Sequence, residues 1–110
     1  MNLKSIQWLG DSRERLRRFP VEARSEIGYQ LALVQQGFQP SDSKSMSIVG
    51  SGVTEIRVHA EGEFRVFYVA KFEEAVYVLH VFVKKTGKTS LFDIALGRSR
   101  YVDLQRRRKQ

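Results

Sequence analysis

The amino-acid sequence predicts an α+β domain in which helices pack against an antiparallel sheet. The strongest signal is Val76–Val83, an almost continuous apolar run that is typical of a central strand buried on both faces. Two shorter segments, Val53–Val58 and Glu63–Ala70, precede it and flank a glycine-containing turn. Apolar residues at helical spacing come before and after these strands. At 110 residues and 42% hydrophobic, residues 1–110 are expected to form one domain around a single core.

The N-terminal segment is expected to contain one strand and one short helix. The pattern of Leu3–Leu9 predicts the strand. Asp11, followed three residues later by Glu14, is an aspartate variant of the capping box and opens the helix. This helix should end near Phe19, because Pro20 disfavours helical geometry in the residue before it.

A second helix follows, with Pro20 suited to its first turn and Gly37 placed to end it. Its buried stripe consists of apolar residues at i, i+4, i+8 and i+11: Ala23, Ile27, Leu31 and Val34. The connection over residues 39–52 is polar and rich in turn-forming residues, and it leaves room for a short edge strand.

The length of the hairpin loop decides which residues of the next two strands share a face. A two-residue turn at Glu61 and Gly62 would pair Val58 with Arg65, which mixes apolar and charged side chains. A three-residue loop over residues 60–62, with the glycine in the left-handed position, would pair Arg57 with Arg65. This second loop puts five apolar residues on one face: Ile56, Val58, Phe64, Val66 and Tyr68. It puts three charged residues on the other: Glu55, Arg57 and Arg65. The three-residue loop is predicted because only it separates the faces.

The C-terminal segment is expected to form a helix. Lys84 and Lys85 leave the last strand at the margin of the sheet, and Ser90 with Asp93 makes a capping-box pattern. The helical stripe that follows consists of Leu91, Ile94, Ala95 and Val102. Gly97 should weaken this helix by roughly 1 kcal/mol relative to alanine.

The net charge of +7 is concentrated in the last quarter of the chain. Residues 1–83 contain 10 Lys and Arg against 10 Asp and Glu, whereas residues 84–110 contain 9 against 2. Such a basic block favours a polyanion or an acidic protein as the partner. A solvated basic tail is the alternative, and Arg106–Lys109 is expected to be mobile.

Composition excludes several kinds of site. The chain has no cysteine, so disulfides and thiolate metal ligands are impossible. No His, Asp and Glu cluster has convincing ligand spacing, and neither a metal nor another cofactor is expected. No apolar run approaches the roughly 18 residues of a membrane helix, and no N-terminal leader pattern is present. A soluble, cytoplasmic protein without a membrane partner is therefore expected.

Five charged residues are expected to converge where the hairpin meets the end of the last strand: Glu55, Arg57, Arg65, Lys84 and Lys85. Cleavage of RNA by its own ribose 2′-OH needs a proton acceptor, positive charge for the phosphorane and a proton source for the leaving oxygen. Carboxylate, guanidinium and ammonium groups can supply these roles. By spacing alone, a solvated charged sheet face explains the same residues. His59 is expected beside the turn and His80 in the core.

The chain resembles the RelE/HigB superfamily of bacterial toxins, in particular its HigB-like, phage-derived branch. The resemblance runs from the N-terminal strand to the last helix and is clearest in "VTEIRV", "EFRVFYVA" and "VLHVFVKKTGKTS". It implies a RelE-like fold and a ribosome-dependent, metal-independent endoribonuclease that cleaves messenger RNA. It also implies a cognate antitoxin, expected to carry a helix-turn-helix part and an acidic segment that covers the basic surface or displaces the last helix.

The resemblance implies roles for individual residues. Arg65 matches the arginine that contacts the scissile phosphate, and Lys84 or Lys85 matches the basic position after the last strand. Arg57 matches the arginine that ends the preceding strand. The RelE branch has lysines where this chain has Val53 and Glu55, and Glu55 is chosen as the general base on chemical grounds. Three further basic residues are expected to bind RNA: Lys88, Arg98 and Arg100.

Two other functions use the same features. One is a non-enzymatic toxin on the same scaffold, such as a ParE-like gyrase inhibitor. The other is a basic RNA-binding module without catalysis.

Overall fold

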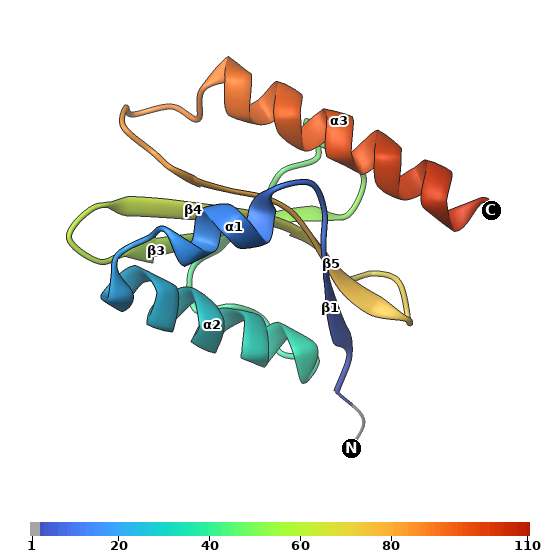
Figure 1. Ribbon diagram of the computed structural model, residues 1–110, viewed down its shortest axis with the longest axis horizontal. Coiled ribbons are helices and arrows are strands. Elements are labelled where there is room, and N and C mark those ends of the chain that lie inside the picture. The colour runs from blue at the N-terminus through green and yellow to red at the C-terminus, as the bar shows by residue number, and fades with distance from the viewer. Residues whose placement is uncertain (1–2) are drawn as a thin grey trace.

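The computed structural model describes residues 3–110, which form the expected α+β architecture (Figure 1). The strands are β1 (Ser5–Trp8), β2 (Ser43–Ser45), β3 (Val53–His59), β4 (Glu63–Val69) and β5 (Ala75–Val83). The helices are α1 (Ser12–Arg17), α2 (Val21–Gln35) and α3 (Leu91–Arg108). None of these helices is both long enough and apolar enough to cross a bilayer.

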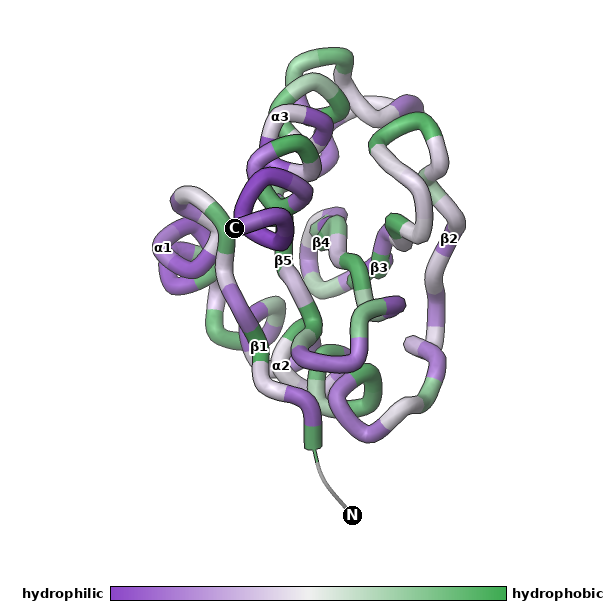
Figure 2. The backbone as a smooth tube through the Cα atoms, turned by 90° about the vertical axis from the view of Figure 1, so that its right-hand side faces the viewer, coloured by the Kyte–Doolittle hydropathy of each residue, from purple (hydrophilic) through white to green (hydrophobic). Residues whose placement is uncertain are grey.

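The strands form one mixed sheet in the order β1-β5-β4-β3-β2. β1 pairs with β5 in parallel, and the other neighbours are antiparallel. The short edge strand for which the connection left room is β2. α1 and α2 lie on one side of the sheet and α3 lies on the other (Figures 1 and 2).

The sheet is buried on both faces, so the chain has two apolar clusters where a single core was expected. The cluster under α2 contains the predicted helix stripe and the predicted apolar face of the hairpin. The cluster under α3 includes Val53, Phe67 and Val69, which lie on the hairpin face that was expected to be the non-core face with Glu55, Arg57 and Arg65. That face of the hairpin therefore belongs to a second apolar core, and Glu55 and Arg65 on it are buried.

The hairpin loop has three residues, as predicted. Arg57 pairs with Arg65 and His59 pairs with Glu63, which leaves residues 60–62 in the loop. One detail of the prediction is wrong, because the left-handed residue is Glu61 (φ 55°). Gly62 has φ 152°, in the positive range that favours glycine.

The helix ends match the sequence signals unevenly. Ser90 caps α3 as predicted, accepting a hydrogen bond from the Asp93 backbone NH at 3.1 Å. Gly37 follows the end of α2 with φ 91°. Asp11 makes no capping bond, because its carboxylate is used by two arginines, and Pro20 precedes the first turn of α2 as its N-cap.

α3 packs on the sheet through its middle, and Arg108 contacts another element from the basic end that was expected to be mobile. A Cβ on Gly97 would lie 2.9 Å from Phe67, so this glycine permits close packing. The Tyr101 hydroxyl donates to the Ser51 carbonyl at 2.8 Å. Arg108 bonds Glu74 at 2.7 Å, which, together with a bond from Tyr77, lowers the pKa of Glu74 to about 2. The helix therefore continues to Arg108 as part of the fold.

Candidate functional site

The hairpin brings Glu55, Arg57 and Arg65 together, but it does not expose them equally. Glu55 Oε1 lies 3.6 Å from Arg57 Nε and 4.0 Å from Arg65 Nε. The side chains of Glu55 and Arg65 are only 2% and 5% exposed, whereas that of Arg57 is 32% exposed. The Thr89 hydroxyl donates to Glu55 Oε2 at 3.3 Å and helps to cover it. An accessible non-core face was expected, so the structure corrects the placement of Glu55 and Arg65.

These residues belong to a closed cycle of alternating charge, here called the charge ring: Asp42, Arg57, Glu55, Arg65, Glu63 and His59. Arg65 Nη2 donates to Glu63 Oε1 at 3.0 Å. His59 closes the cycle, with its ring nitrogens 2.8 Å from Glu63 and 3.0 Å from Asp42. The hydrogen bond to Glu63, followed by that to Asp42, raises the pKa of His59. The ring therefore pairs both arginines with carboxylates, although Arg57 Nε and Arg65 Nε are buried and make no hydrogen bond within residues 3–110.

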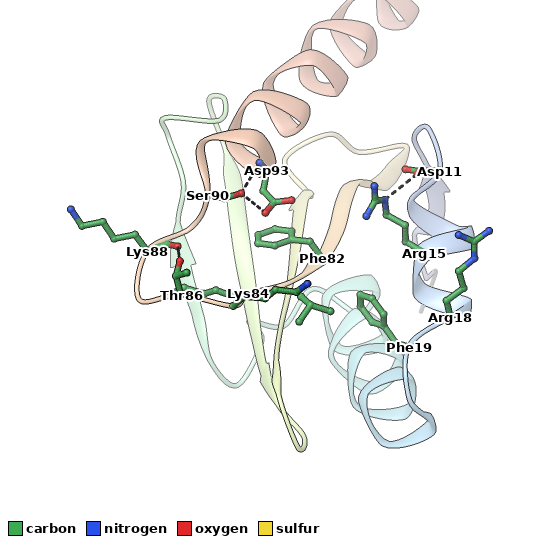
Figure 3. A pocket seen from close by; sticks show the side chains of 12 residues that line it. Asp11, Arg15, Arg18, Phe19, Phe82, Lys84, Thr86, Lys88, Ser90 and Asp93 are labelled. Carbon is green, nitrogen blue, oxygen red and sulfur yellow. Dashed lines mark hydrogen bonds and ion pairs between the residues drawn. The ribbon is translucent and has the colours of Figure 1, made fainter.

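A cleft of about 530 Å³, lined by none of the ring residues, opens between α1 and the segment that follows β5 (Figure 3). Both predicted strand-end lysines, Lys84 and Lys85, line it, and so does Lys88. Arg15 and Arg18 line it from the α1 side. These five cations define the basic cleft. Its apolar lining is Phe19, Phe82 and Val83.

The basic cleft differs from the charge ring in how its charges are matched. Within residues 3–110, no ion pair involves Arg18, Lys84, Lys85 or Lys88. Arg15 is the exception, because its Nε bonds Asp11 at 3.0 Å. Four unmatched cations around one cleft make a positive potential that favours an anionic ligand.

A carboxylate and a buried histidine lie at the helix end of the cleft. Asp93 lines the cleft, and its side chain is 16% exposed. Its Oδ1 is 2.7 Å from His80 Nε2, and its Oδ2 accepts from the Ser90 hydroxyl at 2.6 Å. Burial lowers the pKa of His80 despite the neighbouring carboxylate. His80 stacks on Phe82 with ring centroids 5.0 Å apart, so the predicted core histidine also supports the lining of the cleft.

Two of the expected RNA-binding residues lie elsewhere. Arg98 is exposed on α3 and is not part of the cleft lining. Arg100 is 11% exposed and donates to the Leu79 carbonyl at 3.1 Å and to Asp11 at 2.6 Å. It therefore fastens α3 to the start of α1, where it is not free to meet a ligand.

Sequence reasoning missed the α1 side of the cleft and the position of Asp93. The run "RERLRR" over residues 13–18 was the available signal for α1. The net charge of residues 1–83 did not reveal this basic run, because acidic residues elsewhere in the same segment cancel its positive charge. Asp93 was read only as a helix cap, since its contact with His80 joins residues 13 positions apart.

Residues 3–110 contain no group of three or more His, Asp or Glu side chains arranged to hold a metal ion. A search of curated proteins found no match to the chain. A family model, described as phage-derived protein Gp49-like (DUF891), matches residues 14–102, which include the hairpin, β5 and most of α3. The chain thus belongs to the Gp49-like family of phage-derived proteins, a family of RelE/HigB-like toxins.

Proposed function

We propose that this protein is the toxin of a toxin-antitoxin pair and that it cleaves messenger RNA on the ribosome. The observation that carries the proposal is the set of unmatched lysines in the basic cleft, whose lining also includes the carboxylate of Asp93. Family membership supports the toxin class. The chemistry uses only side chains, because RNA supplies its own nucleophile in the ribose 2′-OH.

In the proposed reaction, Asp93 accepts the proton of the 2′-OH as its oxygen attacks the adjacent phosphorus. The ammonium groups of Lys84 and Lys85 stabilise the charge on the phosphorane oxygens. The bond from phosphorus to the 5′-oxygen then breaks, and one lysine gives that oxygen a proton. The products are a 2′,3′-cyclic phosphate and a 5′-hydroxyl end, with no change in redox state.

Asp93 replaces Glu55 in this proposal because of accessibility. Glu55 is 2% exposed and lies behind Thr89, whereas Asp93 lines the cleft. Arg57 is 32% exposed, but it lines a separate groove with Asp42 and His59 and is given no part in the reaction. Arg65 would act by positioning the hairpin beneath the site, because it is committed to Glu63.

Reconstitution tests the proposal. Purified protein with messenger RNA and programmed ribosomes should give fragments with cyclic phosphate ends, and RNA without ribosomes should stay intact. The double variant Lys84→Ala with Lys85→Ala should cleave about 100-fold more slowly or worse, as expected when charge stabilisation is lost. Lys44→Ala with Lys109→Ala removes equal charge from exposed positions outside the cleft and should cleave normally. Equal activity of the two double variants would refute the assigned site.

The proposed antitoxin is a cytoplasmic partner with a helix-turn-helix part and an acidic segment that covers the basic cleft. Displacement of α3 is disfavoured, because Arg100, Tyr101 and Arg108 all bond other elements. Co-expression with the neighbouring reading frame should give a complex whose affinity falls with added salt. A complex insensitive to salt would argue against electrostatic covering of the cleft.

A second candidate is a toxin that acts by binding alone, such as a ParE-like gyrase inhibitor. The charge ring favours it, because Arg57 and Arg65 are paired within the protein. Growth arrest without RNA fragments, together with inhibited gyrase, would identify this function. Binding to RNA with neither cleavage nor growth arrest would leave a simple RNA-binding module.

A further inference from the structure

The α1 side of the basic cleft is the feature that the proposed reaction leaves unused. Arg15 and Arg18 come from a different segment of the chain than the strand-end lysines, but they line the same cleft. Figure 3 shows Lys84, Arg15 and Arg18 in that order across the cleft, with the side chain of Lys88 pointing away from them. The cations thus form a track across the cleft. A ligand with one phosphate would occupy only a part of it.

We propose that α1 is the second arm of a single-stranded RNA site, in which Arg15 and Arg18 bind phosphates flanking the one held by the lysines. This rests on the proposed function for the nature of the polyanion. A strand that crosses the cleft presents a phosphate at every nucleotide, which matches a track of cations better than a compact anion does. Arginine suits such contacts because its planar fork can hold two phosphate oxygens.

The floor and size of the cleft favour unpaired nucleotides. Phe19 and Val83 lie among the cations and are partly exposed, whereas Phe82 is buried beneath them; apolar or aromatic surface between basic residues is what single-stranded sites offer to bases. The volume of about 530 Å³ is that of a small-molecule site. It can admit part of one strand, whereas paired bases of a duplex would hold their faces away from this floor.

The two arginines differ in how freely they can act. Arg18 is exposed and forms no ion pair within residues 3–110, so phosphate binding costs it no internal contact. Arg15 is paired with Asp11, so it must weaken or break this ion pair to bind a phosphate. Asp11 would then still be paired with Arg100. Arg18 should therefore contribute more than Arg15 to binding.

α1 supplies its own control. Arg13 and Arg17 lie on the same helix and carry the same charge, but they do not line the cleft. One double variant carries Arg15→Ala and Arg18→Ala, and the control double variant carries Arg13→Ala and Arg17→Ala. Comparing the two double variants therefore separates direct phosphate contact from the general electrostatic field of the helix.

The test measures binding of a fluorescent 2′-O-methyl octauridylate by anisotropy, from about 50 to 250 mM salt, where counterion release governs affinity. The 2′-O-methyl groups prevent cleavage, so binding is read independently of the proposed reaction. Each lost phosphate contact on a single strand lowers the slope of log K against log salt by about 0.7. The Arg15 and Arg18 double variant should lose about 1.4 from this slope, by the same rule, and bind more weakly. The Arg13 and Arg17 double variant should keep the wild-type slope.

Three results would overturn the proposal. Equal loss of slope in both double variants would mean that α1 acts only through its overall charge. An unchanged slope in the Arg15 and Arg18 variant, and in Arg18→Ala alone, would remove the arm even if ribosomal cleavage persists. Binding of polyglutamate and not RNA, with the same dependence on Arg18, would assign the arm to an acidic protein segment. Intact RNA binding without ribosomal cleavage would instead refute the proposed reaction and leave the arm standing.

Discussion

Two glycine-to-alanine substitutions should have different effects on stability, although each places the same methyl group inside a helix. Gly28 lies in α2, is exposed, and has no atom within 4 Å of its would-be Cβ. Gly97 lies in α3, where the Cβ would be 2.9 Å from a Phe67 ring carbon and 3.0 Å from a Val49 methyl. Both neighbours are buried and cannot move aside freely.

The magnitudes follow from two terms. Alanine gains up to about 1 kcal/mol over glycine in either helix. At Gly28 this is the whole effect, so Gly28→Ala should stabilise the fold by about 0.5–1 kcal/mol. At Gly97 the overpacking cost of about 1–3 kcal/mol outweighs or cancels the gain. The helix term is common to both variants, so the difference between them measures the packing of α3 on the sheet.

Urea denaturation followed by circular dichroism would measure both changes in the free energy of unfolding. The two variants should differ by about 1–3 kcal/mol, with Gly28→Ala the more stable. Equal stabilisation of both would contradict the close packing of Gly97 against Phe67 and Val49. It would also weaken the argument that α3 stays docked when the antitoxin binds.

Three further predictions concern the charged residues. Arg65→Ala should destabilise the fold by about 3 kcal/mol in urea denaturation, because it leaves the buried carboxylate of Glu55 with a single arginine; a fully stable variant would contradict the burial. The hydrogen bond to Glu63 is the larger cause of the raised pKa of His59. Protonated His59 therefore stabilises the fold, and this contribution is complete below the ordinary pKa of about 6.5. The contribution is lost as the pH rises through the raised pKa. Melting curves should therefore show wild-type protein exceeding His59→Gln more at pH 6 than at pH 8, and a constant difference would refute the linkage. Asp93→Asn should abolish ribosomal cleavage with little loss of stability, and retained cleavage would exclude it as the proton acceptor.

The sequence was sufficient for the order of the elements and for the hairpin register. Separation of apolar from charged residues decided between two loops, because a shift of one residue moves every side chain to the other face. The same reasoning did not predict that the second face of the hairpin is also buried. Phe67 and Val69 share that face with Arg65, and together with the double-sided burial of β5 they implied a cover on both sides.

The site was harder to predict because it joins segments far apart in the chain. Lys84 and Lys85 follow directly from the end of β5, and sequence placed them correctly at the sheet margin. Arg15 reaches the same cleft only because α1 packs against β5, which no local pattern encodes. Arg100 shows the reverse problem: its position in a basic helix suggested a ligand contact, but its partners are Asp11 and a backbone carbonyl.

The most direct test of the central claim is mapping of RNA 5′ ends in cells after brief induction. Wild-type protein should produce new 5′ ends inside translated codons within minutes of growth arrest. The double variant Lys84→Ala with Lys85→Ala, expressed at the same level, should produce none. Growth arrest without new ends inside coding regions, or identical ends with the double variant, would contradict a messenger-RNA-cleaving toxin whose chemistry takes place in the basic cleft.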